Sequence, residues 1–169
     1  MAAAVALADR LLALPFAPMG GLVAGYWAMD GEIPLHSWQL RLPHALTYCL
    51  PVLHGEVLCF APWRAGEALV TNRYGIPEPD VAPAHALPAE AMSLVVMPLV
   101  GFDGQCNRLG MGGGWYDRSF TARRSTAPPP WLVGVGFDVQ HVEHLDTQEW
   151  DVRADAICTD SQTLLATDP

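Results

Sequence analysis

The chain has 169 residues, of which 51% are hydrophobic and 16% are charged, so it is predicted to form one folded domain over residues 1–169 and not a disordered chain. Its 18 acidic and 9 basic residues give a net charge of −9, which makes duplex nucleic acid a poor candidate partner because a polyanion is repelled. All nine basic residues are arginines, which excludes the lysine chemistry of a Walker A loop, a Schiff base or a kinase.

The first predicted element is an amphipathic helix within residues 1–15 (MAAAVALADRLLALP). It is not expected to be a signal peptide, because Asp9 and Arg10 interrupt its apolar part and no basic segment precedes that part. Most of its buried stripe is predicted to come from Val5, Leu7, Leu11, Leu12 and Leu14.

Neither the apolar runs nor the cysteines point to a membrane or an exported protein. No apolar run approaches the roughly 18 uncharged residues that a membrane span requires. Cys49, Cys59, Cys106 and Cys158 lie far apart, without the spacing of a zinc site. We therefore expect reduced, mostly buried thiols and a cytoplasmic protein.

Five apolar runs rich in valine and aromatic residues follow, at residues 21–29, 47–53, 57–63, 93–102 and 131–137. Continuous apolar runs indicate strands buried on both faces, as in a parallel sheet covered by helices. Residues 35–45 and 113–124 have helical patterns, although Pro43 should end or bend the first of them. We therefore predict an α/β fold: a three-layer, mostly parallel open sheet with helices on both faces.

A glycine-rich loop, NRLGMGGGWYDR at residues 107–118, lies between the fourth of these strands and a helix. Ligands of open α/β sheets bind beyond the carboxyl ends of strands, where glycines and a helix N-terminus can hold a phosphate. A tight glycine-rich turn that closes onto the sheet explains the composition equally well. The dinucleotide pattern GxGxxG fails, because Trp115 stands at its third glycine. The preceding DGQCN lacks the later ligands of a calcium loop.

The three residues after the glycines each allow two interpretations. Trp115 and Tyr116 can stack on a planar heterocycle, although aromatic residues at the start of a helix more often belong to a core. Asp117 can hold a magnesium ion that bridges phosphates. It can equally be a first-turn acid that needs no metal, because the helix dipole already favours a carboxylate there.

Several ordered segments together resemble the 5-formyltetrahydrofolate cyclo-ligase family, also called 5,10-methenyltetrahydrofolate synthetases. The longest is MPLVGFDGQCNRLGMGGGWYDR at residues 97–118, which is similar to the family's strand and RLG-x-G-x-G-YYDR loop. GYWAMDGEI at residues 25–33, YGIPEP at 74–79, and GFDVQ with EWDVRADAICTD towards the end match further family segments in order. The resemblance implies a NagB/RpiA/CoA-transferase-like fold.

The resemblance also implies a reaction. The family converts 5-formyltetrahydrofolate to 5,10-methenyltetrahydrofolate with ATP and Mg²⁺, and it releases ADP and phosphate. The formyl oxygen is thought to attack the γ-phosphate, after which N10 closes the ring and phosphate leaves. Positioning and charge neutralisation suffice for such a step, so no nucleophilic side chain is expected. The expected protein is a monomer that uses the folate as its small-molecule substrate.

Site residues follow from the matching positions. The resemblance implies an ATP loop of Arg108, Leu109, Gly110, Met111, Gly112, Gly113, Gly114, Trp115 and Tyr116. Arg108, Tyr116 and Asp117 would be catalytic, and Asp117 and Asp151 would hold Mg²⁺. The folate would lie against Trp27, Glu32, Tyr74 and Trp115. Without the resemblance, Glu32 reads as a turn carboxylate, Trp27 as a core residue and Asp151 as a cap.

The sequence also departs from the family pattern. Family members usually begin with a basic helix that carries a K-x-x-x-R pattern, which has no counterpart here. We expect either a start placed too far downstream or a shortened member with impaired use of ATP. Trp115 replaces a tyrosine, Gly113 adds a glycine, and GEIPLHSW surrounds Glu32 where the family has E-(V/I)-(D/E)-T. The alternative functions are a non-catalytic folate- or nucleotide-binding relative and, third, a structural or interaction protein.

Overall fold

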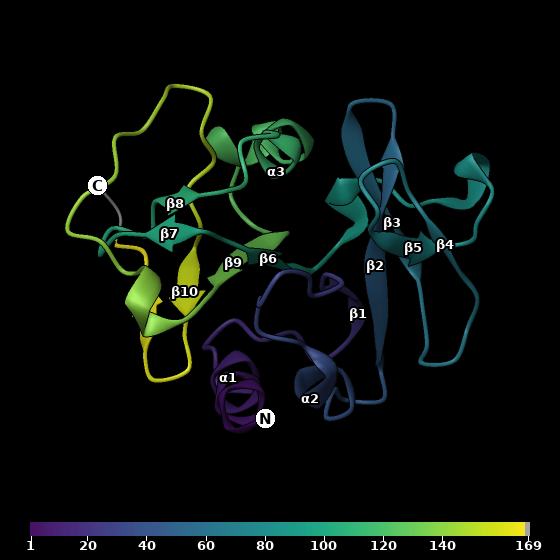
Figure 1. Ribbon diagram of the computed structural model, residues 1–169, viewed down its shortest axis with the longest axis horizontal. Coiled ribbons are helices and arrows are strands. Elements are labelled where there is room, and N and C mark those ends of the chain that lie inside the picture. The colour runs from purple at the N-terminus through teal and green to yellow at the C-terminus, as the bar shows by residue number, and fades with distance from the viewer. Residues whose placement is uncertain (168–169) are drawn as a thin grey trace.

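The computed structural model describes residues 1–167, and a seven-stranded sheet lies at its centre (Figure 1). The strand order is β11-β10-β9-β6-β1-β2-β3. The five inner strands are parallel, and the edge strands β11 and β3 are antiparallel to their neighbours. The strands are β1 (Gly21–Ala24), β2 (Leu46–His54), β3 (Val57–Pro62), β6 (Leu94–Pro98), β9 (Trp131–Val135), β10 (Ala156–Cys158) and β11 (Thr163–Leu165). The predicted mostly parallel open sheet is confirmed.

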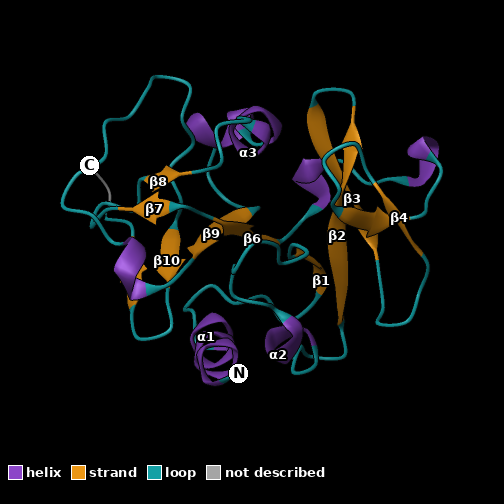
Figure 2. Cartoon of the chain, in the orientation of Figure 1, coloured by secondary structure: helices purple, strands orange, loops and turns teal. Residues whose placement is uncertain are grey.

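Helices cover both faces of the sheet (Figure 2). The helices α1 (Ala2–Leu12) and α2 (His36–Gln39) lie on one face, and α3 (Trp115–Ser119) lies on the other. Adjacent residues of β6 serve different layers: Val96 packs in the core under α1 and α2, whereas Val95 packs in the core that contains Phe120 beside α3. Alternation of this kind buries both faces of a strand, so the predicted three layers are confirmed.

The N-terminal helix is present, but its buried stripe differs from the prediction at Val5 and Leu12. The side chains buried on this helix and just after it are Ala4, Leu7, Ala8, Leu11 and Leu14. Val5 is 46% exposed, and Leu12 is only partly buried. The stripe follows the three- and four-residue spacing of a helix face, and the prediction for Val5 is wrong because alanines fill that spacing instead.

Two predicted helices are shorter than expected. Residues 35–45 form only the single turn of α2, because the chain turns at residues 40–42 ahead of Pro43. Residues 113–124 form α3 and then a 3₁₀ turn, η3 (Thr121–Arg124), with Phe120 between them outside helical geometry. The hydroxyl groups of Ser119 and Thr121 bond to carbonyl groups of the preceding turn, a competition with the backbone that weakens helices.

Two predicted strands also end early, and both ends matter for the cavity described below. The first run leaves the sheet after Ala24 and turns where Asp30 and Gly31 have φ values of 49° and 87°. The fourth run breaks after Pro98, and its remainder pairs as β7 (Gly101–Phe102) with β8 (Arg108–Leu109) in a separate hairpin. Both segments therefore leave the sheet at the carboxyl ends of strands.

The remaining elements are short. A second hairpin joins β4 (Leu69–Thr71) to β5 (Pro77–Pro79). The other 3₁₀ turns are η1 (Pro83–His85), η2 (Ala89–Ala91) and η4 (Asp138–Gln140).

All four cysteines are free thiols, as predicted. Over residues 1–167 none of the helices has the length and apolar character needed to cross a membrane. The assignment of residues 1–169 to one domain stays a prediction, since its last two residues lie outside the described part.

Candidate functional site

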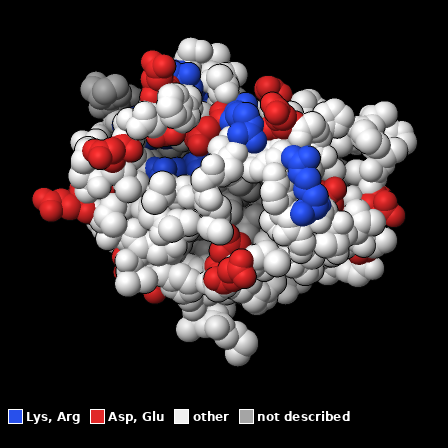
Figure 3. Space-filling view, turned by 45° about the horizontal axis from the view of Figure 1, so that its top comes forward, with Lys and Arg blue, Asp and Glu red and all other residues white. Residues whose placement is uncertain are grey.

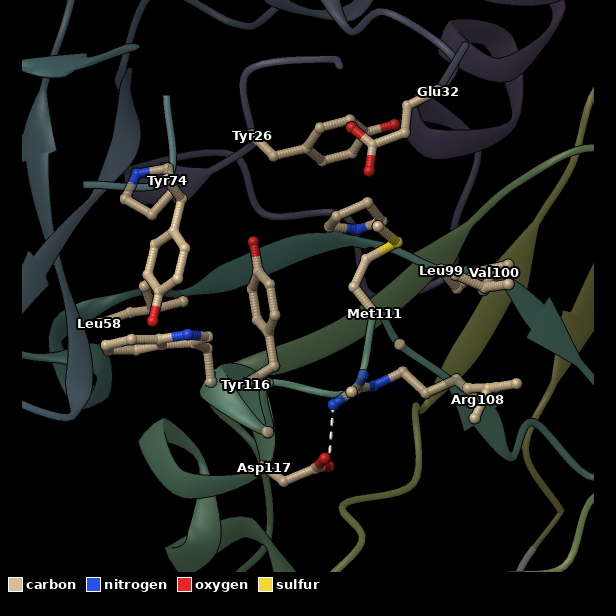
Figure 4. Close-up of a pocket in the computed structure, with 18 of the residues that line it drawn as sticks. Tyr26, Glu32, Leu58, Tyr74, Leu99, Val100, Arg108, Met111, Tyr116 and Asp117 are labelled. Atoms are coloured by element: carbon tan, nitrogen blue, oxygen red, sulfur yellow. Dashed lines mark hydrogen bonds and ion pairs between the residues drawn. The ribbon is translucent and has the colours of Figure 1, made fainter. Parts of the chain in front are cut away.

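A cavity of about 650 Å³ opens beyond the carboxyl ends of β1, β2 and β6 (Figure 4). The chain passes from β1 to β2 on one side and from β6 to β9 on the other, so the sheet order reverses between β1 and β6. Open α/β sheets bind ligands at such a point. Most of the lining is apolar, with polar groups gathered at its two ends, as in small-molecule sites.

The glycine loop forms one wall of this cavity. It follows the β7–β8 hairpin and leads into α3, and positive φ values at Gly112 and Gly114 let the chain turn there. Within the described residues, no backbone N–H from Gly110 to Gly114 donates to a protein acceptor. The loop therefore presents unpaired donors at the start of a helix, as an anion requires. The tight turn of the sequence interpretation is present, and the phosphate cradle stays a prediction that these unpaired donors support.

Arg108 and Asp117 lie together at the loop end of the cavity. Arg108 Nη2 donates to Asp117 Oδ1 at 2.9 Å, and the arginine side chain is only 5% exposed. The backbone N–H of Val152 also donates to Asp117 Oδ1 at 2.9 Å. Among the buried side-chain polar atoms of residues 1–167, Arg108 Nε alone has no hydrogen-bond partner. A buried donor without a partner is costly, so this end is suited to an additional anion.

The carboxylates that were assigned to Mg²⁺ line the same cavity. Asp151 Oδ2 accepts the N–H of Gln148 at 2.8 Å. Asp117 Oδ2 forms none of the hydrogen bonds found in the described residues. No group of three or more His, Cys, Asp or Glu side chains there could hold a metal alone. Mg²⁺ commonly takes one or two carboxylates and completes its shell with phosphates and water, so these two residues fit that mode of binding.

Glu32 and Tyr26 mark the opposite end of the cavity (Figure 4). The Glu32 carboxylate accepts the Met29 N–H at 2.9 Å, and the Tyr26 hydroxyl donates to the Ile33 carbonyl at 2.6 Å. Burial raises the pKa of Glu32, the Met29 hydrogen bond lowers it, and Asp30 raises it further, with a net rise. A half-buried carboxylate that keeps an unpaired oxygen can accept hydrogen bonds from a heterocycle.

Aromatic side chains enclose the space between the two ends. Tyr74 and Trp115 meet edge to face, with ring centroids 5.9 Å apart, and Trp27 meets Trp63 in the same way at 5.8 Å. Tyr116 points into the cavity, and burial raises its pKa while the Arg108 charge lowers it, with a net rise. The phenol therefore stays protonated at neutral pH, so it can donate a hydrogen bond.

Every residue that the sequence singled out for the site lines this one cavity, from Trp27 and Glu32 to Asp117 and Asp151. The structure therefore places these residues around one cavity, and their roles in binding and catalysis stay predictions. It adds Tyr26, Met29 and Trp150, which the sequence interpretation missed. The sequence places Tyr26 within a predicted strand, and only the early end of β1 brings it to the cavity.

Asp103 is a further residue whose role was missed. Its side chain is buried, and its carboxylate accepts the N–H groups of Gln105, Asn107 and Leu145 as well as the Asn107 amide. Burial works against its ionisation, but these hydrogen bonds leave the pKa below its usual value. The DGQCN segment thus forms a turn centred on Asp103 that ties the β7–β8 hairpin to the loop before Asp151.

The fold and the cavity define a class: open-sheet α/β proteins with an anion-binding loop and a small-molecule cavity at the switch point. The profile of the 5-formyltetrahydrofolate cyclo-ligase family matches residues 1–160. The 5-formyltetrahydrofolate cyclo-ligase of Escherichia coli (strain K12) is 36% identical over 160 residues, which cover 92% of this chain and 86% of that protein. The Haemophilus influenzae cyclo-ligase is also 36% identical, over 77% of this chain and 71% of that protein.

Solved structures agree with these sequence relatives. The 5,10-methenyltetrahydrofolate synthetase of Aquifex aeolicus superimposes with a TM-score of 0.79 at 25% identity, over 98% of this chain and 82% of that one. The Mycoplasma pneumoniae 5,10-methenyltetrahydrofolate synthetase shares the fold, with a TM-score of 0.66 at 19% identity over 94% and 85% of the two chains. The chain belongs to the 5-formyltetrahydrofolate cyclo-ligase family, a family of ligase enzymes.

Proposed function

We propose that the chain cyclises 5-formyltetrahydrofolate to 5,10-methenyltetrahydrofolate, with ATP and Mg²⁺, and releases ADP and phosphate. Its membership of the cyclo-ligase family supports this reaction. One structural observation carries the proposal: a single cavity joins a loop of unpaired N–H donors and a buried arginine to an apolar chamber that ends at Glu32. A phosphate donor and a pterin could therefore lie in one enclosed space.

At the loop end, the proposed role of the protein is to bind and orient the triphosphate. The N–H groups of residues 110–114 would donate to phosphate oxygens, and Arg108 would stabilise the charge that builds up during transfer. Asp117 and Asp151 would hold the magnesium ion, which neutralises phosphate charge when it is bound. Arg108 is already held in place by Asp117, so little reorganisation is needed when the nucleotide binds.

At the other end, the proposed role is to orient the folate. Glu32 would accept hydrogen bonds from the pterin ring, and Trp27, Tyr74 and Trp115 would enclose the flat part of the substrate. The formyl oxygen would then face the γ-phosphate, which it attacks before N10 closes the ring and phosphate leaves. The Tyr116 hydroxyl, between the two ends in Figure 4, would donate to an oxygen at the transfer point. Positioning of this kind supplies most of the rate in phosphoryl transfer.

The test is formation of 5,10-methenyltetrahydrofolate, followed by its absorbance, from 5-formyltetrahydrofolate, ATP and Mg²⁺. We expect turnover that requires all three and that is lost on chelation of Mg²⁺. Calorimetric binding of the folate without turnover would overturn the proposal and favour the non-catalytic relative. The absence of binding and turnover would favour a structural or interaction protein. The monomeric state, the cytoplasmic location and the lack of a nucleic-acid partner stay predictions.

A further inference from the structure

A second, smaller cavity of about 250 Å³ adjoins the first. Tyr74, Gly113 and Trp115 line both cavities and therefore form the wall between them. Arg73, Arg118 and Glu56 complete the smaller cavity, and the roles proposed above leave it unused. Basic side chains are visible on the face that carries the cavities, although the chain as a whole is acidic (Figure 3).

Two guanidinium groups converge on one indole ring in this cavity. The central carbon of Arg118 lies 4.9 Å from the Trp115 ring centroid, and that of Arg73 lies 5.4 Å from it. Arg73 is also 5.2 Å from the centroid of the Tyr74 ring. These distances fall within the range of cation–π contacts, which hold a guanidinium over a ring without using its N–H donors.

The donors of these two arginines are used differently. Arg118 Nε donates to the Glu56 carbonyl at 2.7 Å and Nη1 donates to the Gly113 carbonyl at 2.6 Å, which fixes the group in place. Arg73 forms no hydrogen bond through its side chain to any other described residue. Neither arginine has a salt bridge within residues 1–167, even though Glu56 borders the same cavity.

We propose that this cavity binds the carboxylates of the glutamyl tail of the folate, with Arg73 and the free Nη2 of Arg118 as the donors. The inference rests on the proposed function. A guanidinium suits this ligand because its planar set of donors matches the two oxygens of a carboxylate. Arg118 offers a fixed donor, and Arg73 is free to close onto the ligand from the β4–β5 hairpin.

The order of the lining groups agrees with the order of chemical groups in a folate. The pterin end is proposed to lie at Glu32, and the aromatic wall of Tyr74 and Trp115 follows it towards the smaller cavity. The Arg108–Asp117 pair lies on a different side of Tyr116 and remains available for phosphates (Figure 4). The substrate and the nucleotide would thus use separate groups of arginine donors.

The experiment compares 5-formyltetrahydrofolate with 5-formyltetrahydropteroate, which lacks the glutamate. For Arg73→Gln we expect KM for the folate to rise about five- to ten-fold, because a charge-assisted hydrogen bond is lost at an exposed position. KM for the pteroate and kcat for both substrates should not change. Arg73→Lys should recover part of the affinity. Calorimetric titration of each variant with 5-formyltetrahydrofolate should give the same ratio without turnover.

Arg124→Gln is the matched control, because Arg124 is exposed and lines neither cavity. It removes the same charge and should leave both KM values within about two-fold of the parent protein, as surface charges away from a site usually do. A rise in KM of Arg73→Gln for both substrates alike, or for neither, would overturn the inference while the proposed function stands. Absence of turnover by the unmodified chain with both substrates would instead count against the proposed function.

Discussion

The two ends of the large cavity are built in different ways. At the loop end, Arg108, Asp117 and the Val152 N–H form a buried polar network with fixed distances. At the Glu32 end, Glu32 keeps one hydrogen bond to its own turn, and the aromatic rings between the two ends lead up to it. A polar network specifies one geometry strongly, whereas apolar walls tolerate a change of shape. Substitutions should therefore affect turnover most at the loop end and substrate affinity most at the Glu32 end.

The largest expected effect comes from Arg108→Gln at the loop end. Loss of its charge should lower kcat about 100- to 1,000-fold, the usual effect of removing one group that stabilises a transition state. KM for the folate should change little, because Arg108 lies away from the Glu32 end. Steady-state kinetics at saturating ATP measure both values. If this variant kept a kcat within a few-fold of the parent, turnover would not depend mainly on the loop end of the cavity.

Asp117→Asn should have the next largest effect. We expect a fall of about 10- to 100-fold in kcat/KM for ATP, because a carboxylate assigned to the metal is lost. The concentration of Mg²⁺ that supports half-maximal turnover should rise in parallel. Asp146→Asn is the control, because that side chain also borders the cavity but is 98% exposed. Equal Mg²⁺ dependence in the two variants would contradict the assignment of Asp117.

Glu32→Gln tests the opposite end of the large cavity, where substrate affinity is expected to change most. KM for 5-formyltetrahydrofolate should rise about ten-fold, since a hydrogen bond to a charged acceptor is lost, and KM for ATP should stay the same. A similar rise in both KM values would mean that the two ends do not act separately.

The same variant also tests stability against pH. The pKa of Glu32 is raised in the folded protein, chiefly by burial. The folded state therefore holds this proton more tightly than the unfolded chain, and its contribution to stability is lost as pH rises from the ordinary pKa of a glutamate through the raised one. Glu32→Gln should have the higher melting temperature at neutral pH, and the gain should vanish below the ordinary pKa. Thermal melts at both pH values would show this, and a gain that is independent of pH would contradict it.

The smallest expected effect concerns the shape of the loop. Gly114 has a φ of 66°, and a Cβ there would lie 3.0 Å from Arg118 Nη1. Gly114→Ala should therefore lower the free energy of unfolding by about 1–2 kcal/mol, the cost of a left-handed residue. Gly110→Ala is the control, because its Cβ would meet only Arg108 Nη1, at an ordinary 3.6 Å. Urea unfolding of both variants measures the difference, and equal values would show that the turn is not strained.

The sequence predicted the loop end of the site better than its surroundings. The glycines, Trp115 and Asp117 are close in the chain, so their grouping follows from local order alone. Glu32, Tyr74 and Asp151 are distant from the loop, and only the family resemblance joined them to it. The contact between Asp117 and the Val152 N–H could not be predicted, because it depends on how the loop before β10 folds back.

Five of the seven strands of the sheet were predicted because their apolar runs leave a strong pattern, whereas the three-residue strands β10 and β11 were not. The ends of elements were predicted poorly, because tertiary contacts set them. An added Cβ at Gly25 would lie 2.2 Å from the Tyr48 hydroxyl, a contact at the end of β1 that no local pattern reports. In α3, the Ser119 hydroxyl also accepts the Leu58 N–H from β3, so a strand contact coincides with the end of the helix.

Three consecutive residues in the first turn of α3 point their side chains in three different directions. Trp115 borders the arginine-lined cavity, Tyr116 points into the large cavity, and Asp117 meets Arg108. Successive residues of a helix point about 100° apart. The length of the segment is therefore more tightly constrained than its composition. A single residue inserted or deleted within this turn would rotate the side chains that follow it by about 100°, towards the wrong neighbours. A substitution that keeps the length of the turn leaves these directions unchanged.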